Sequence, residues 1–240
     1  MPKRGRAPFV ALVDLLARQR ADVDPSAIAD GRVLIDGRVL MNPAARVRRD
    51  ASVRVLSRRW LRGEIKLTHA LDRFGVEATG RVAADVGSNV GGFVTALLER
   101  GDRRVYAIDA GVGQLLGRLR IDPRVVNLEG HNLGRVTRAD VPEPVELITV
   151  DLSYLSLADA VPQLDALDIV ASADLVALVK PTFELHQARV AATEDDVARA
   201  ITSATAAISR SGWEVVALCD APATGQRGAR EAFIHARRVG

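Results

Sequence analysis

The hydrophobic positions of the first 60 residues predict short helices followed by short strands. Apolar residues recur at helical spacing over residues 8–20, and a second short helix is predicted at 26–29, after a proline. Two apolar runs, 33–35 and 38–40, flank an Asp-Gly pair that is typical of a tight hairpin turn. One more strand is predicted at 52–56. This region therefore reads as a small α+β unit.

From residue 64 onward, apolar strands alternate with amphipathic helices, after a first helix at 64–75. We predict strands at 82–86, 104–108, 125–128, 145–150 and 175–179, helices near 91–100, 112–120, 157–164 and 194–211, and a final strand pair at 213–219 and 231–237. Such alternation favours a doubly wound, mostly parallel sheet, which binds ligands at the carboxyl ends of its strands. We expect a domain at 1–57, a linker at 58–63 and a second domain at 64–240.

Composition narrows the class of protein. Hydrophobic residues make up 48% of the 240-residue chain and charged residues 26%, as in globular proteins. The single cysteine, Cys219, and four scattered histidines argue against a disulfide framework and a metal site. No apolar run reaches the roughly 18 residues of a membrane span, and no signal-peptide core follows the basic N-terminus. We therefore expect a cytoplasmic protein without metal or membrane partners.

Charge is unevenly distributed along the chain. Residues 1–62 hold 14 basic and 6 acidic residues, a net charge of +8, whereas the remainder carries −5. A basic module on an acidic body indicates binding of a polyanion, with a merely solvated basic surface as the alternative. The chain has 30 arginines but only three lysines, which draws attention to Lys66 and Lys180 inside the body. Lysine can lose its proton in catalysis, whereas arginine stays charged.

A glycine-containing loop follows the first strand of the predicted sheet. Gly87 and Gly91 are four residues apart, which fits neither the dinucleotide G-x-G-x-x-G pattern nor a phosphate-binding P-loop. The next strand ends at Asp109, whose carboxylate could accept hydrogen bonds from a ribose diol. With Asp85 in the first strand, this arrangement resembles the S-adenosylmethionine (SAM) site of Rossmann-like methyltransferases. A glycine turn without a ligand and a nicotinamide site are the alternatives.

Two charged residues follow later apolar strands: Asp151 after 145–150 and Lys180 after 175–179. Residues in these positions lie at the ligand edge of a parallel sheet. The alternatives are a solvated strand end for either residue, or a helix N-cap for Asp151.

Together, these stretches resemble the TlyA (haemolysin A-like) ribosomal RNA 2′-O-methyltransferases, which share their catalytic pattern with FtsJ-type RNA methyltransferases. The matching stretches are Arg62-Gly63-x-x-Lys66-Leu67, Asp85-x-Gly87-x-x-x-Gly91-Gly92-Phe93, Val105-Tyr106-Ala107-x-Asp109, Gly113-Gln114-Leu115, Leu119-Arg120-x-Asp122-Pro123-Arg124-Val125, Asp151-Leu152-Ser153-Tyr154-x-Ser156-Leu157, Leu178-Val179-Lys180-Pro181-x-Phe183-Glu184 and Gly228-x-x-Glu231-x-Phe233. The resemblance implies a Rossmann-like methyltransferase domain with a seven-stranded sheet behind an S4-like RNA-binding domain. It also implies SAM as cofactor, and a cytidine ribose in small- or large-subunit ribosomal RNA as substrate.

The resemblance assigns roles to individual residues. It implies a catalytic tetrad of Lys66, Asp151, Lys180 and Glu231. Within it, we expect Lys180 to take the proton of the ribose hydroxyl and the two acids to position the lysines and the hydroxyl. Implied cofactor-binding residues are Asp85, Gly87, Ser88, Asn89, Gly91, Gly92, Phe93, Asp109, Asn132 and Asp151. Candidate RNA-binding residues are Arg4, Arg6, Arg18, Arg20, Arg46, Arg48, Arg49, Arg59 and Trp60, with Trp60 alternatively an anchor between domains.

The chain departs from the family pattern at Asn89-Val90 in the cofactor loop, where Ser-Thr is usual, and at Gly130-His131-Asn132, where Arg-Thr-Asn is usual. The first departure leaves a second hypothesis open: a SAM- or RNA-binding ribosome factor that does not catalyse. The membrane-lytic activity implied by the family's older name has no support in the sequence.

Overall fold

The computed structural model describes residues 9–29, 31–56, 61–186, 193–222 and 230–239. The N-terminal elements are β1 (Phe9–Ala11), α1 (Leu12–Gln19), α2 (Ser26–Ala29), β2 (Val33–Ile35), β3 (Arg38–Val39), β4 (Arg46–Arg48) and β5 (Val53–Val55). They form two small antiparallel sheets, β1–β4 and β3–β2–β5, over a core that includes Leu12, Leu16 and Ile28. Asp36 and Gly37 both have positive φ, as the predicted tight hairpin turn requires.

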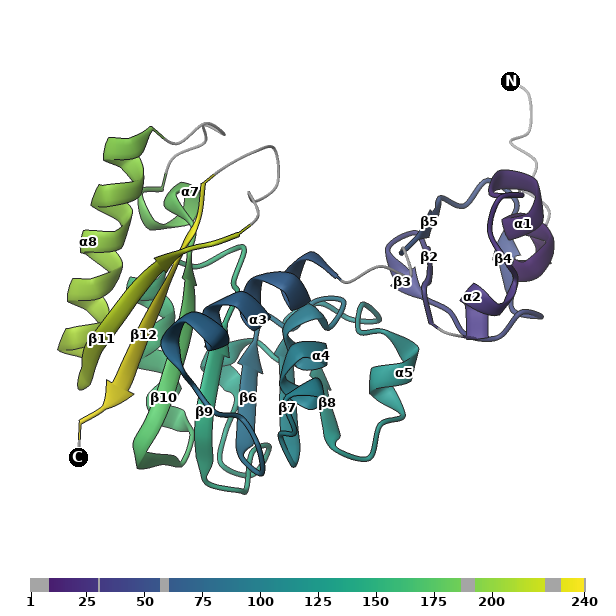
Figure 1. The fold of residues 1–240 in the computed structure, drawn as a ribbon. Helices are drawn as coiled ribbons and strands as arrows, with labels where there is room; N and C mark the ends of the chain where they lie inside the picture. Colours follow the sequence, from purple (N-terminus) through teal and green to yellow (C-terminus); the bar gives the residue numbers. More distant parts are fainter. Residues whose placement is uncertain (1–8, 30, 57–60, 187–192, 223–229, 240) are drawn as a thin grey trace.

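The larger sheet has seven strands in the described part of the chain, in the order β11-β12-β10-β9-β6-β7-β8 (Figure 1). Its strands are β6 (Val82–Val86), β7 (Arg104–Asp109), β8 (Val125–Glu129), β9 (Val145–Val150), β10 (Ile169–Val179), β11 (Trp213–Asp220) and β12 (Ala232–Arg238). The five strands from β8 to β10 are parallel, whereas β12 and β11 run antiparallel at one edge. The predicted mostly parallel sheet is therefore confirmed.

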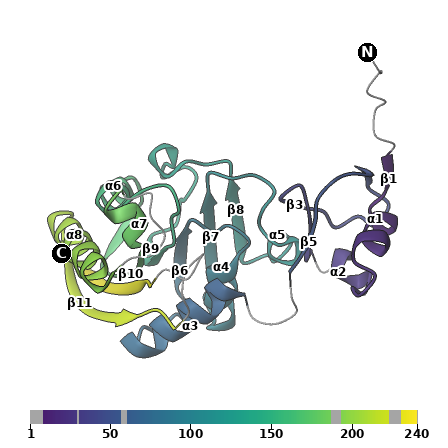
Figure 2. The same ribbon diagram turned by 90° about the horizontal axis from the view of Figure 1, so that it is seen from above.

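Helices cover both faces of this sheet (Figure 2). They are α3 (Arg62–Phe74), α4 (Gly92–Glu99), α5 (Gly117–Arg120), α6 (Leu157–Ala160), α7 (Pro181–Glu184) and α8 (Glu194–Arg210), with 3-10 turns η1 (Leu133–Arg135) and η2 (Val161–Ala166). The core between α3, α4 and the sheet includes Leu67, Leu97 and Phe233, and the core under α8 includes Ile208 and Trp213. Among the described residues, no helix is both long and apolar enough to cross a membrane.

Some predicted boundaries are wrong. The helix predicted at 112–120 is only α5, because Gly113 adopts a left-handed φ of 75° and the side chain of Glu129 takes the backbone N–H groups that a helix would use. Strand β10 begins at Ile169 rather than at 175, with a register irregularity before Asp174. The short elements β1, β4 and α7 are too brief for the hydrophobic pattern to predict.

The N-terminal unit lies beside α5 (Figure 1), and its hairpin contacts the segment before that helix. The backbone N–H of Val39 donates to the carbonyl of Gly113 at 2.6 Å. A side chain on Gly31 would place its Cβ 2.4 Å from the backbone nitrogen of Gly117. The close backbone approach, together with a φ of 68°, explains glycine at position 31.

Candidate functional site

Parallel strands bring five predicted or chemically active positions to one edge of the sheet. Gly87 follows β6, Asp109 and Glu129 end β7 and β8, Asp151 follows β9, and Lys180 follows β10. Asp109 and Glu129 are direct partners in the β7–β8 register. Because the carboxyl ends of parallel strands share an edge, residues far apart in the sequence meet there.

The loop after β6 is a cradle built from backbone. Gly87 and Gly91 both have φ of 92°, and Asn89 is also left-handed at 47°. A Cβ on Gly87 would lie 2.5 Å from the carbonyl oxygen of Asp151, and one on Gly91 would lie 2.1 Å from Leu119. Both positions therefore require glycine, because their φ is left-handed and because the Asp151 backbone and the Leu119 side chain approach closely.

Three further residues of the predicted cofactor set lie inside the protein. A Cβ on Gly92 would be 2.9 Å from the Cα of Gly63, so this glycine lets α4 approach α3. Phe93 is only 3% exposed, and its ring centroid lies 6.1 Å from that of Phe233. Gly92 therefore packs against α3 and the Phe93 ring against the core, and their contact with the cofactor stays a prediction. Ser88 is also buried, and its hydroxyl has no hydrogen-bond partner among the described residues.

Asp109 keeps the loop in place and retains capacity for a ligand. Its Oδ2 accepts from the backbone N–H of Asn89 and its Oδ1 from that of Gly111, each at 2.7 Å. A carboxylate oxygen can accept more than one hydrogen bond, so both oxygens can still accept from hydroxyl groups of a sugar. This geometry fits the predicted role in binding a ribose.

Asp85, by contrast, is completely buried in β6. Its Oδ1 accepts from the Thr149 hydroxyl at 2.7 Å. Burial raises the pKa of the Asp85 carboxyl to about 8, against the lowering effect of the Thr149 hydrogen bond, and the charges of Asp151 and Asp109 raise it further. Asp85 is therefore held by Thr149 of β9, its Oδ2 has no hydrogen-bond partner among the described residues, and its cofactor-binding role stays a prediction.

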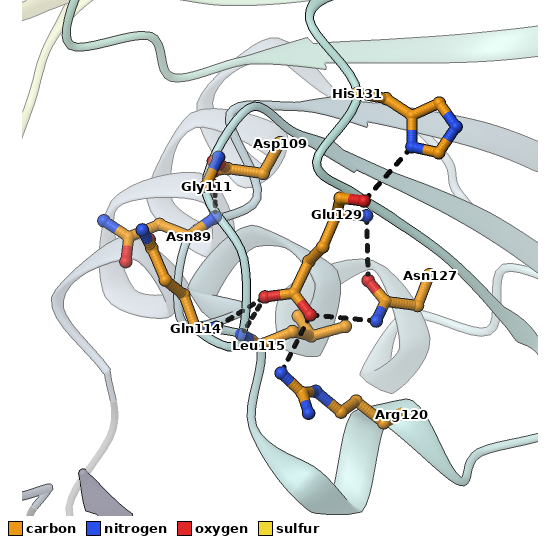
Figure 3. Close-up of polar contacts among 9 residues, drawn as sticks. All are labelled: Asn89, Asp109, Gly111, Gln114, Leu115, Arg120, Asn127, Glu129 and His131. Carbon is orange, nitrogen blue, oxygen red and sulfur yellow. Dashed lines mark hydrogen bonds and ion pairs between the residues drawn. The ribbon is translucent and has the colours of Figure 1, made fainter. Parts of the chain in front are cut away.

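Glu129 is a site residue that the sequence analysis missed (Figure 3). Its side chain accepts from the backbone N–H groups of Gln114, at 2.5 Å, and Leu115, at 2.9 Å. It also accepts from Arg120 at 2.8 Å and Asn127 at 3.0 Å. Burial acts to raise the pKa of Glu129, but these hydrogen bonds and the charge of Arg120 outweigh it and lower the pKa. The sequence signal that could have identified Glu129 is its position, as an acidic residue directly after the strand predicted at 125–128.

The segment after Glu129 is hydrogen-bonded to the end of β7 and the loop that follows it. The N–H of His131 donates to the Asp109 carbonyl at 3.0 Å, and the N–H of Gly130 donates to the Gly111 carbonyl at 2.8 Å. Asn132 is exposed, and its side chain accepts from the Gly134 N–H at 3.1 Å, capping η1. The ends of β7 and β8 thus form one hydrogen-bonded surface beside the glycine cradle.

The predicted tetrad divides into two lysine–carboxylate pairs. Lys66, on α3, forms a buried ion pair with Glu231, just before β12, and their side chains are 8% and 6% exposed. Lys180 pairs with Asp151 at 2.5 Å and donates to the Ser153 hydroxyl at 2.9 Å. The second pair is more accessible, at 15% and 25% exposed.

Strand register relates the two pairs to each other. Val179 of β10 is paired with Ala232 of the antiparallel β12, so extending the register by one residue sets Lys180 opposite Glu231. The four residues, one from α3 and three from loops, therefore lie together near the carboxyl ends of β9 and β10 and the start of β12. In the described part of the chain, no group of three or more His, Cys, Asp or Glu side chains could hold a metal ion.

The arginines of the N-terminal unit differ in their availability. Arg20 and Arg48 each form an ion pair with an aspartate two residues later, Asp22 and Asp50. The side chains of Arg18, Arg46 and Arg49 are exposed. Arg4, Arg6, Arg59 and Trp60 lie outside the described residues.

Comparisons with known proteins match both the fold and the sequence. The family model for FtsJ-like methyltransferases matches residues 61–238. The chain is 35% identical over 246 residues to the 16S/23S rRNA (cytidine-2′-O)-methyltransferase TlyA of Mycobacterium tuberculosis, covering 99% of this chain and 91% of that protein. A solved structure described as a hemolysin, from Streptococcus thermophilus, has a TM-score of 0.72 and 26% identity, covering 97% and 90% of the two chains.

A more distant solved structure shares the fold alone. It is described as an S-adenosylmethionine-dependent methyltransferase from Listeria monocytogenes, with a TM-score of 0.55 and 14% identity. It covers 75% of this chain and 99% of its own length. The seven-stranded sheet with helices on both faces is therefore a Rossmann-like methyltransferase fold.

Proposed function

The chain belongs to the FtsJ-like methyltransferase family, and on that premise we propose that it methylates the 2′-hydroxyl of a cytidine ribose in ribosomal RNA, using SAM. The mycobacterial relative, which matches over nearly the whole chain, carries that activity in its name. The observation that carries the proposal is the convergence of two lysine–carboxylate pairs beside a glycine cradle at one sheet edge. Such a site can bind one reactant and deprotonate the other.

The residues present fit the cofactor. The left-handed backbone at Gly87, Asn89 and Gly91 forms a tight turn between β6 and α4, as in the predicted cofactor loop, and Asp109 can accept from the ribose hydroxyls of the cofactor. When bound, SAM supplies an electrophilic methyl group on a sulfonium, which leaves as the neutral thioether. The exposed Asn132 lies beyond the end of β8, on the same side of the sheet.

Lys180 is the proposed proton acceptor. Lys180, which is ion-paired with Asp151 in the structure, must lose its own proton before attack; the ribose oxygen then becomes nucleophilic as its proton moves to the amine nitrogen, while the new oxygen–carbon bond forms. Asp151 and Ser153 hold the lysine nitrogen in place, and Lys66 holds Glu231 at the neighbouring position. Proton transfer of this kind contributes about 10²- to 10⁴-fold in rate, and alignment of the two reactants supplies more.

The N-terminal unit is the proposed RNA-binding module, of S4-like type. Its region carries a net charge of +8, and Arg18, Arg46 and Arg49 project exposed side chains that can contact phosphates. Binding through phosphates predicts an affinity that falls steeply with salt. Ribosomal subunits as substrate place the activity in the cytoplasm.

Radiolabelled methyl transfer from SAM to 30S subunits, 50S subunits and their naked RNAs tests this function. We expect label that survives alkaline hydrolysis as an uncleaved dinucleotide. The Lys180→Ala variant should lose methyl transfer but bind SAM as before. Arg103→Ala, just before the amino end of β7, should retain both methyl transfer and SAM binding. Retained transfer in Lys180→Ala would contradict the role of Lys180. Absence of both label and SAM binding in the unaltered protein would favour a non-catalytic RNA-binding factor.

A further inference from the structure

Glu184 is a buried acid that the proposed chemistry does not use. It ends α7, the short helix that begins directly after Lys180, and the two residues are joined because the Glu184 N–H donates to the Lys180 carbonyl at 3.1 Å. Its side chain turns away from solvent and accepts from the backbone N–H of Leu157 at 2.7 Å. Leu157 is the first residue of α6. Helices α6 and α7 lie on the same face of the sheet as α8 (Figure 2).

The loop that ends at Leu157 carries the partners of Lys180. It begins at Asp151, whose N–H donates to the Val86 carbonyl at 2.9 Å, and it includes Ser153. The loop is therefore fixed at its start by the sheet and at its end by Glu184. Lys180 is thus connected to Leu157 in two ways. One connection runs along α7 to Glu184 and its hydrogen bond to Leu157, and the other runs from the lysine nitrogen to Asp151 and Ser153 and along the loop to Leu157.

We propose that Glu184 is a positioning residue for methyl transfer: by anchoring the N-terminus of α6 to α7, it holds Asp151 and Ser153 at the distance that orients Lys180. The inference rests on the proposed function. The Glu184 carboxylate accepts from Leu157, whereas the partners of the lysine are Asp151 and Ser153, so Glu184 acts through the loop. Ser156 and Asp159 add local support, since the Ser156 hydroxyl accepts from the Asp159 N–H at 3.2 Å and caps α6.

The anchor persists when the carboxyl is protonated. Burial raises the pKa of Glu184 to about 7, against the lowering effect of the Leu157 hydrogen bond, and the charge of Asp159 raises it further. Its second oxygen, Oε2, is buried without a hydrogen-bond partner among the described residues. A proton on Oε2 leaves Oε1 free to accept from Leu157. A glutamine, which also has one acceptor oxygen, is therefore a fair substitute.

The test compares two substitutions at position 184. Glu184→Leu keeps most of the volume but removes the acceptor, and we expect kcat for methyl transfer to fall about 10- to 100-fold, as for a small misplacement of a reacting group. The KM and Kd for SAM should change less than kcat, because the start of the loop, at Asp151, stays hydrogen-bonded to Val86 of the sheet. Glu184→Gln should restore kcat to within about threefold of the unaltered protein, because the hydrogen bond to Leu157 remains.

A matched control separates positioning from general stability. Glu146→Leu removes a carboxylate that accepts from the backbone N–H of Val82 at 2.9 Å, near the amino ends of β6 and β9, away from the candidate site. It should lower the thermal midpoint without lowering kcat. Equal losses of kcat in Glu184→Leu and Glu146→Leu would overturn the proposal, as would normal kcat in Glu184→Leu.

A second variant removes the donor of the same hydrogen bond. Leu157→Pro removes the N–H at the first residue of a helix, where proline is tolerated, and should lower kcat as Glu184→Leu does. The double variant should lose little more kcat than Leu157→Pro alone, since both substitutions remove the same hydrogen bond and Leu157→Pro also removes a buried leucine side chain. Additive losses would refute the anchor. Failure of methyl transfer in the unaltered protein would instead refute the proposed function, so the two failures are distinguishable.

Discussion

Removing the Glu129 side chain should weaken SAM binding without unfolding the protein. This carboxylate, 7% exposed, accepts hydrogen bonds from the backbone of Gln114 and Leu115 and from the side chains of Arg120 and Asn127. The two backbone bonds hold the chain that follows Gly111, whose own N–H donates to Asp109. In Glu129→Ala the two backbone groups lose their partner, and the segment can open towards water.

The magnitude follows from these bonds. A hydrogen bond to a charged group contributes about 1.5–3 kcal/mol. If opening to water recovers half of the contribution of the two backbone bonds, the closed segment loses about 2 kcal/mol. At about 1.4 kcal/mol per tenfold, the Kd for SAM should rise by about 30-fold. Glu129→Gln keeps one acceptor oxygen but turns an N–H towards Arg120, so its effect should be intermediate.

Calorimetric titration of SAM into each variant measures these changes. Glu143→Gln is the control, because Glu143 binds Arg103, Arg104 and the Tyr106 hydroxyl near the amino end of β7, away from the candidate site. It should leave the Kd for SAM unchanged. A Kd for Glu129→Ala within about twofold of the unaltered protein would refute the reasoning, and would mean that Asp109 needs no support from β8.

Two further predictions concern buried charges. Lys66→Met or Glu231→Leu alone leaves one charge buried without its partner and should cost about 3–5 kcal/mol in chemical denaturation, whereas the double variant should cost less than either; additive losses would contradict the ion pair. Asp85→Asn should raise the thermal midpoint, more at pH 8 than at pH 5. The folded pKa of Asp85, about 8, lies above the ordinary value of 3.8, so its contribution to stability is lost as pH rises between those values. An equal effect at both pH values would exclude that titration.

The helical and strand periodicities were sufficient to predict the parallel sheet, because strands from β6 to β9 are fully or mostly apolar and alternate with helices. They failed between Gly111 and Gly117, where a helix was predicted. Local sequence there has helical spacing, but Glu129 competes for the backbone donors from 14 and 15 residues away. A contact of that separation leaves no mark on the local pattern.

The sequence by itself determined the fold class, the glycine loop, and Asp151 and Lys180 at strand ends, because glycine or a strand-ending charge has the same physical meaning in any chain. The grouping of these two residues with Lys66 and Glu231 came from the resemblance to the family. Only the tertiary structure decided which lysine binds which acid, that Asp85 and Phe93 are buried, and that Glu129 and Glu184 hold the loops around the site. Partners and burial arise from elements that meet in space, and their distance along the chain carries no information about that meeting.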